Sequence, residues 1–118
     1  MKRLESIADA LALLNDYHDP ESEAYRLRNP GLLRSKPVLG VAEETVRTFT
    51  CHQAGYKALT DALRKQCERY KEKTLKDGLT HHGHGSEPDV KTAVDFIKRA
   101  TGDKTIGANT KLGSFLDA

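Results

Sequence analysis

Three stretches of the sequence place apolar residues at steps of three and four, the spacing that gathers side chains on one side of a helix. The stretches run from Leu4 to Leu14, from Tyr56 to Tyr70 and from Val90 to Ala100. No alternation of strands with helices accompanies them, so a parallel sheet is not expected. The pattern predicts a mainly helical (α+β) domain.

Polar residues set the ends of these helices. The first is predicted over residues 3–15, because Asn15 and the later Pro20 favour a break in the helix. The third is expected to begin after Ser86, which has an acidic residue three positions later, and to end before Gly102. The second, over residues 53–71, is predicted to be the longest.

The segments between the helices carry turn and strand signals. Residues 20–40 hold three of the four prolines, which predicts an ordered, turn-rich stretch with one short helical turn over residues 21–25. The β-branched and aromatic sequence ThrValArgThrPheThr at 45–50 predicts one strand of a small hairpin. Leu75 and Leu79 indicate a short helix, and the two glycines within residues 81–85 predict a loop after it.

Size and composition bound the possibilities. A chain of 118 residues has room for one modest core, so a single domain over residues 1–118 is expected. The formal charge of +2 is spread through the chain without a concentrated basic face, which makes nucleic acid an unlikely partner. No apolar run reaches the length of a membrane span, and no secretory signal is expected. Cys51 and Cys67 lack CxxC spacing, which favours free thiols in a reducing compartment.

A histidine cluster is the candidate metal site. His81, His82 and His84 lie close to Glu87 and Asp89, and imidazoles with a carboxylate are ligands for zinc or nickel. Adjacent histidines point apart on most backbones, so an exposed polar loop is the alternative. The sequence has no phosphate-binding loop, dinucleotide fingerprint, nucleophile elbow or HExxH motif, and no cofactor is expected.

Carboxylates and arginines provide further candidates. Glu43 and Glu44, or Glu21 and Glu23, are neighbouring acids of the kind that glycoside hydrolysis needs, although such neighbours are also common on surfaces. Three arginines around the AsnProGly turn could bind a carboxylate, a phosphate or a sugar acid, or pair with these acids instead. They are Arg26, Arg28 and Arg34.

The order of short motifs over residues 7–112 resembles a family of phage and prophage proteins. In that family a first helix is followed by an Arg-x-Asn-Asn-Pro-Gly-Asn-Leu-Arg turn, and its members are often labelled phage structural proteins or lysozyme-like domains. The matching segments are ArgLeuArgAsnProGlyLeuLeu at 26–33, ThrPheThr at 48–50, GlyTyrLysAlaLeu at 55–59, ThrLeu at 74–75, SerGluProAsp at 86–89 and ArgAlaThrGly at 99–102.

This resemblance implies a small lysozyme-like fold and cleavage of peptidoglycan glycan strands in the family's ancestry. The family's candidate acid, a Glu after the first helix, is replaced by Asn15. An amide cannot protonate a leaving glycosidic oxygen, so a catalytically impaired domain is expected. In the turn, Asn29 is kept, whereas Arg28 and Leu32 stand where the family has asparagine.

The resemblance also implies a groove between the end of the first helix, the arginine-rich turn and the hairpin near Glu43 to Phe49. Tyr17 and Tyr25 are candidates to stack on sugar faces. The full set of expected binding residues is Asn15, Tyr17, Tyr25, Arg26, Arg28, Asn29, Arg34, Glu43, Glu44 and Phe49.

Three functions remain open from the sequence. The first is a phage-derived lysozyme-like domain that binds peptidoglycan glycan or a protein partner without catalysis. The second is an active muramidase or lytic transglycosylase that uses Asp16, Glu21 or Glu23 as its acid. The third is a small phage-encoded inhibitor of a host protein. In each case the expected location is the cytoplasm or the virion.

Overall fold

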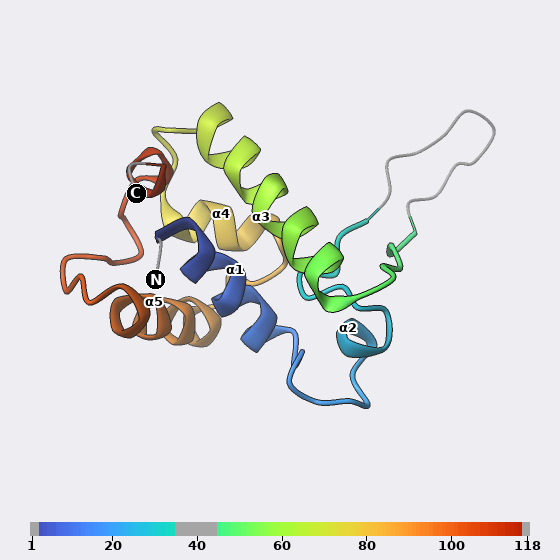
Figure 1. The fold of residues 1–118 in the computed structure, drawn as a ribbon. Helices are drawn as coiled ribbons and strands as arrows, with labels where there is room; N and C mark the ends of the chain where they lie inside the picture. The colour runs from blue at the N-terminus through green and yellow to red at the C-terminus, as the bar shows by residue number, and fades with distance from the viewer. Residues whose placement is uncertain (1–2, 35–44, 117–118) are drawn as a thin grey trace.

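The computed structural model describes residues 3–34 and 45–116, and within these ranges the chain is mainly helical (Figure 1). The helices are α1 (Arg3–Leu14), α2 (Glu23–Arg26), α3 (His52–Arg69), α4 (Leu75–His81) and α5 (Glu87–Thr101), followed by the 3-10 helix η1 (Leu112–Phe115). The helices predicted from apolar spacing are confirmed, each to within two residues at its ends. No pattern in the sequence predicted η1.

Helix α1 forms the centre of the core. It lies between α3 and α5 and packs against both (Figure 1). Its apolar stripe, which includes Ile7 and Leu11, is buried because both neighbours present their own stripes to it. The buried cluster ends at Phe115 of η1, which has no exposed surface. None of the helices in the described ranges has the length and hydropathy that a bilayer crossing requires.

The caps of α4 and α5 explain where these helices begin. The Ser86 hydroxyl accepts a hydrogen bond from the Asp89 amide, as the sequence predicts, and α5 ends at Gly102 with a φ of 73°. At α4, Thr74 and Asp77 form a full capping box. In α5 the Asp89 carboxylate does not complete such a box, because it binds His84 instead.

The expected hairpin is not seen in the described residues. Of segment 45–50, only Val46 forms a β-bridge, an isolated one with Arg34. The segment is extended against the preceding turn, where the Arg47 amide donates to the Leu33 carbonyl (2.8 Å) and the Phe49 amide to the Leu27 carbonyl (2.9 Å). Residues 35–44, including Glu43 and Glu44, lie outside the described ranges.

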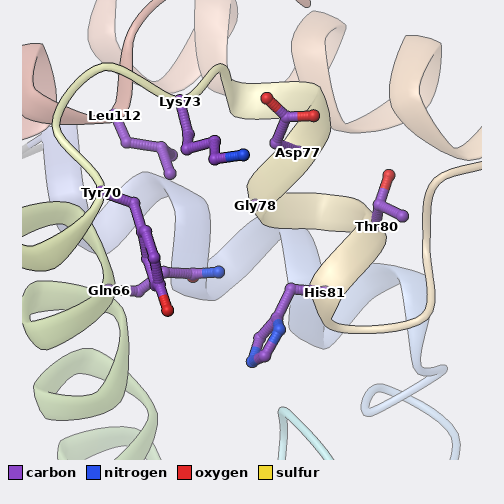
Figure 2. Close-up of a pocket in the computed structure, with 8 residues that line it drawn as sticks. All are labelled: Gln66, Tyr70, Lys73, Asp77, Gly78, Thr80, His81 and Leu112. Carbon is purple, nitrogen blue, oxygen red and sulfur yellow. The ribbon is translucent and has the colours of Figure 1, made fainter.

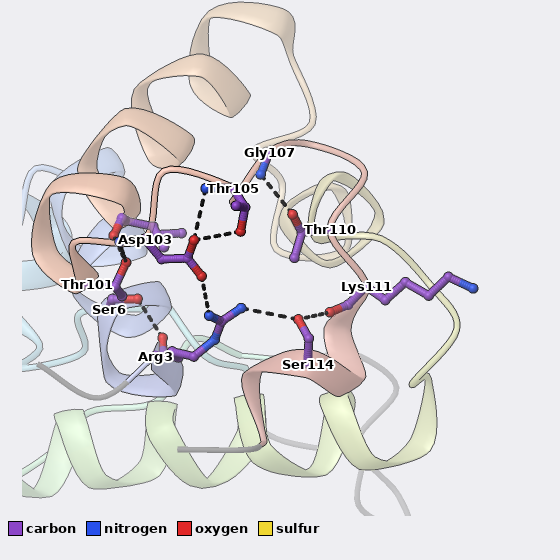
Figure 3. A network of polar contacts seen from close by, with 10 residues as sticks. Arg3, Ser6, Thr101, Asp103, Thr105, Gly107, Thr110, Lys111 and Ser114 are labelled. Carbon is purple, nitrogen blue, oxygen red and sulfur yellow. Dashed lines mark hydrogen bonds and ion pairs between the residues drawn. The ribbon is translucent and has the colours of Figure 1, made fainter.

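A polar network fastens the end of the described chain to its beginning (Figure 3). The Arg3 guanidinium donates to the Asp103 carboxylate (2.5 Å) and to the Ser114 hydroxyl (3.4 Å). Asp103 also accepts from the Thr105 amide (2.9 Å) and hydroxyl (2.6 Å). The Arg3 bonds hold the loop after α5 and η1 against α1. The hydrogen bonds from Thr105, and then the one from Arg3, lower the pKa of the Asp103 carboxyl to about 2.

Candidate functional site

A cleft of about 700 Å³ lies between the AsnProGly turn and helices α3 and α4. It is lined by Asn15, Gly31, Leu32, Leu33, Arg34, Ala62, Gln66, His81, His82 and Gly83. The groove that the resemblance implies lies between the end of the first helix, the turn and the hairpin near Glu43 to Phe49. The cleft shares the first two of these sides, but none of the described residues of segment 45–49 lines it. Two of the expected binding residues, Asn15 and Arg34, line it.

The turn that forms one wall is held from inside by Asn29. Its side-chain amide donates to the carbonyls of Leu33 (3.0 Å) and Arg47 (2.9 Å), and its oxygen accepts from the Leu33 amide (2.9 Å). Asn29 has no exposed surface. It was expected to bind a ligand, but its polar atoms are fully used in joining the turn to the 45–50 segment. Its role is therefore structural.

Helix α3 approaches the same turn through Gly55. A Cβ atom at this position would lie 2.0 Å from the Arg28 carbonyl oxygen and 2.9 Å from Pro30 Cδ. Only glycine permits this separation, because real Cβ atoms do not approach backbone atoms so closely. The glycine that begins GlyTyrLysAlaLeu thus fixes the position of α3 against the turn, and with it the width of the cleft.

Asn15 joins three segments at the edge of the cleft. Its Nδ2 donates to the Pro30 carbonyl (3.0 Å), which fixes the orientation of the amide, and its Oδ1 faces His84 Nε2 (2.8 Å). The other ring nitrogen of His84 faces the Asp89 carboxylate (3.0 Å). Both ring nitrogens of His84 therefore face an oxygen atom, one on Asn15 and one on Asp89. An amide held in this way positions neighbouring groups and supplies no acidic proton.

Two of the three histidines of the predicted metal site bind different partners. His84 binds Asn15, while His82 contacts the Gln66 side-chain oxygen (3.2 Å). Burial, together with the nearby His81 and His84, lowers the pKa of His82 to about 4, so this ring is neutral at pH 7. Within the described chain, no three His, Cys, Asp or Glu side chains are grouped as metal ligands.

The candidate acids do not line the cleft. Asp16 is exposed just beyond α1 with a φ of 57°. Glu21 and Glu23 are exposed before and within the first turn of α2. Among the described residues that line the cleft there is no carboxylate. The lining thus lacks the shielded carboxyl group that usually supplies the general acid in glycoside cleavage.

The expected aromatic binding residues form a separate cluster. Tyr17 is buried, and its hydroxyl bonds His52 Nδ1, while its ring lies 5.8 Å from Tyr25 and 5.6 Å from Tyr56 between centroids. The Arg28 guanidinium covers the Tyr25 ring at 4.5 Å. These rings pack behind the turn instead of lining the cleft.

Arg26 and Phe49 also lie outside the lining of the cleft. Arg26 is exposed at the end of α2, and Phe49 is half-buried under the Arg47 guanidinium, 4.6 Å from its ring centroid. Sequence reasoning missed the opposite wall, which Ala62 and Gln66 of α3 provide. Their i, i+4 spacing places them on one face of the helix, but only the tertiary fold brings that face to the turn.

The two cysteines are free thiols, as the sequence predicts. Cys51 is exposed, while Cys67 is buried in the core, where burial raises the pKa of its thiol to about 11. Neither lines the cleft.

No family model matches this chain, and no curated protein or solved structure does either.

Proposed function

We propose that this chain is a phage- or prophage-derived lysozyme-like domain that binds peptidoglycan glycan strands in the cleft beside Asn15 without an efficient hydrolytic step. The observation that carries the proposal is Asn15 itself. It stands where the resembled family has its candidate acid, and its amide is hydrogen-bonded on both sides, to the Pro30 carbonyl and to His84.

The size and lining of the cleft support a sugar ligand. Its volume of about 700 Å³ falls within the range of about 300–1,000 Å³ that small-molecule sites occupy. Leu32, Leu33 and Ala62 offer apolar contacts to the flat faces of sugar rings. Polar side chains also line the cleft, and the hydroxyl and acetamido groups of a sugar can form hydrogen bonds with them. They are the side chains of Gln66, His81 and Arg34.

Binding is tested by sedimenting the protein with purified sacculi. Ala62 lies half-buried on the cleft wall, so Ala62→Phe fills the cleft from within α3. Lys65→Phe, at an exposed position of the same helix that does not line the cleft, is the matched control. We expect the wild type and Lys65→Phe to sediment with sacculi and Ala62→Phe to stay in solution. A wild type that stays in solution would contradict the proposal and favour a protein partner.

Catalysis is tested by the turbidity of the same sacculi. We expect the wild type to leave the turbidity unchanged, since loss of a general acid typically costs about 10²–10⁴ in rate. Asn15→Glu places a carboxyl group beside the cleft, and clearing by this variant alone would identify a disarmed lysozyme. Clearing by the wild type would contradict the proposal and return Asp16, Glu21 and Glu23 to consideration as acids. Circular dichroism before each assay checks that the variants are folded.

A further inference from the structure

A second pocket adjoins the cleft. It has a volume of about 360 Å³ and lies between α3 and α4, and Leu112 of η1 also lines it. Figure 2 shows Gln66 and Tyr70 on the α3 side and Asp77 and His81 on the α4 side.

The two cavities share their boundary residues. Gln66 and His81 line both the cleft and the pocket. Gln66 is held in place by His82, whose Nε2 lies 3.2 Å from its side-chain oxygen. A ligand that extends from the cleft past Gln66 and His81 therefore enters the pocket beside Tyr70.

The pocket combines an aromatic ring with an ammonium group. Tyr70 is 41% exposed, which makes it one of two large apolar side chains exposed in the described residues. Lys73 is exposed, and its positive charge helps to lower the pKa of the Asp77 carboxyl, although the hydrogen bonds from Thr74 lower it more.

The one carboxylate that lines this pocket is already engaged. Asp77 accepts from the Thr74 amide (3.1 Å) and the Thr74 hydroxyl (3.0 Å) as part of the α4 capping box. Over residues 69–77 four basic side chains (Arg69, Lys71, Lys73 and Lys76) stand against two acidic ones (Glu72 and Asp77). This surplus of positive charge favours an acidic group on the ligand.

We infer that the pocket between α3 and α4 binds a carboxylate-bearing part of the glycan, with Lys73 paired to the carboxylate and Tyr70 packed on an adjacent sugar ring. This inference rests on the proposed function, and it extends the ligand from the cleft past Gln66 and His81. Muramic acid residues carry a lactyl carboxylate, and attached stem peptides carry further ones. Either source supplies the chemistry that Lys73 recognises.

The test compares three soluble ligands by calorimetric titration. They are a neutral oligomer of N-acetylglucosamine, a peptide-free glycan strand that keeps its lactyl carboxylates, and a strand that keeps its stem peptides. We expect the wild type to bind one or both acidic strands about fivefold more tightly than the neutral oligomer, since an exposed ion pair contributes up to about 1 kcal/mol. This preference should shrink as salt is added. Preference for the peptide-bearing strand alone would identify the stem peptide as the source.

Variants separate this inference from the proposed function. Lys73→Gln should remove the preference for acidic strands and leave the neutral oligomer's affinity unchanged, whereas Lys65→Gln on α3 should behave as wild type. Tyr70→Ala should weaken all three ligands. A wild type without preference, or a preference that survives Lys73→Gln, would overturn the inference. If ligands still bind and Ala62→Phe abolishes that binding, the cleft proposal stands on its own; if no ligand binds the wild type, both fall.

Discussion

Two asparagine side chains, Asn15 and Asn29, join separate segments of the chain around the AsnProGly turn. Asn15 and Asn29 each use both ends of the amide to join segments that are distant in sequence. A side-chain amide suits this task, because it donates and accepts at once and remains uncharged when buried. Asn15, which we propose stands in the place of a catalytic acid, is thus also a structural bridge between α1, the turn and the loop before α5.

Replacement of Asn15 by leucine should therefore destabilise the domain. The change leaves the Pro30 carbonyl and a ring nitrogen of His84 without their partner, and an unsatisfied buried group costs about 1–3 kcal/mol. Denaturant unfolding measures the loss. Asn109→Leu, at an exposed loop position, is the control and should shift the midpoint little. Equal shifts for the two variants would show that the Asn15 bridge contributes nothing.

For Gly55→Ala, helix propensity and tertiary packing predict opposite changes in stability. Within a helix, alanine is favoured over glycine by about 1 kcal/mol, so propensity alone predicts that Gly55→Ala stabilises. The added Cβ would lie 2.0 Å from the Arg28 carbonyl oxygen, and this clash should instead destabilise by about 2 kcal/mol or more. Thermal unfolding decides between the two signs. Gly107→Ala adds a methyl group where no atom lies within 4 Å and should be nearly neutral.

At the scale of elements, the helices were predictable and the contacts between them were not. Apolar spacing located α1, α3 and α5, because each buries one stripe and exposes the rest. The β-branched run at 45–50 predicted a hairpin strand. In the described residues this segment instead forms one isolated β-bridge and a few backbone hydrogen bonds with the turn. Of the residues that line the cleft, Asn15 and Arg34 were among the binding residues predicted from the sequence. Gln66 was not, since no local pattern tells which helix faces the turn.

The capping box of α4 provides a test at this scale. Thr74→Ala removes the acceptor for the Asp77 amide and the donor to the Asp77 carboxylate, and it should cost about 1 kcal/mol. Because the lost cap stabilises the start of α4, amide exchange in residues 75–81 should quicken more than in α1. Thr92→Ala, exposed on α5, is the matched control. Unchanged exchange in α4 would mean that tertiary packing alone holds this short helix.

For the whole molecule, His82 makes stability depend on pH. Its pKa is about 4 in the fold because burial disfavours the charged ring, against about 6.5 in an unfolded chain. Between these values the unfolded chain binds more protons, so stability is full above about pH 6.5 and falls as pH drops towards 4. The loss is about 3 kcal/mol at most.

This pH dependence is measured by urea unfolding at a series of pH values. His82→Gln keeps a hydrogen-bonding side chain without a titrating ring, so its stability should fall less steeply between pH 6.5 and 4. His18→Gln, at an exposed histidine, should retain the wild-type slope. A His82→Gln variant with the wild-type slope would assign the acid sensitivity to other groups. Asp103 adds a separate loss at lower pH, as its carboxyl titrates towards its pKa of about 2.

The bond between Arg3 and Asp103 spans a hundred residues, and Phe115 completes the core around α1 still later in the sequence. On a ribosome, α1 emerges long before the partners that cover it. At synthesis rates of about 5–20 residues per second, its apolar stripe stays uncovered for on the order of ten seconds. The nascent chain therefore exposes this stripe to chaperones until the helices that cover it, η1 being the last of those described, have been translated.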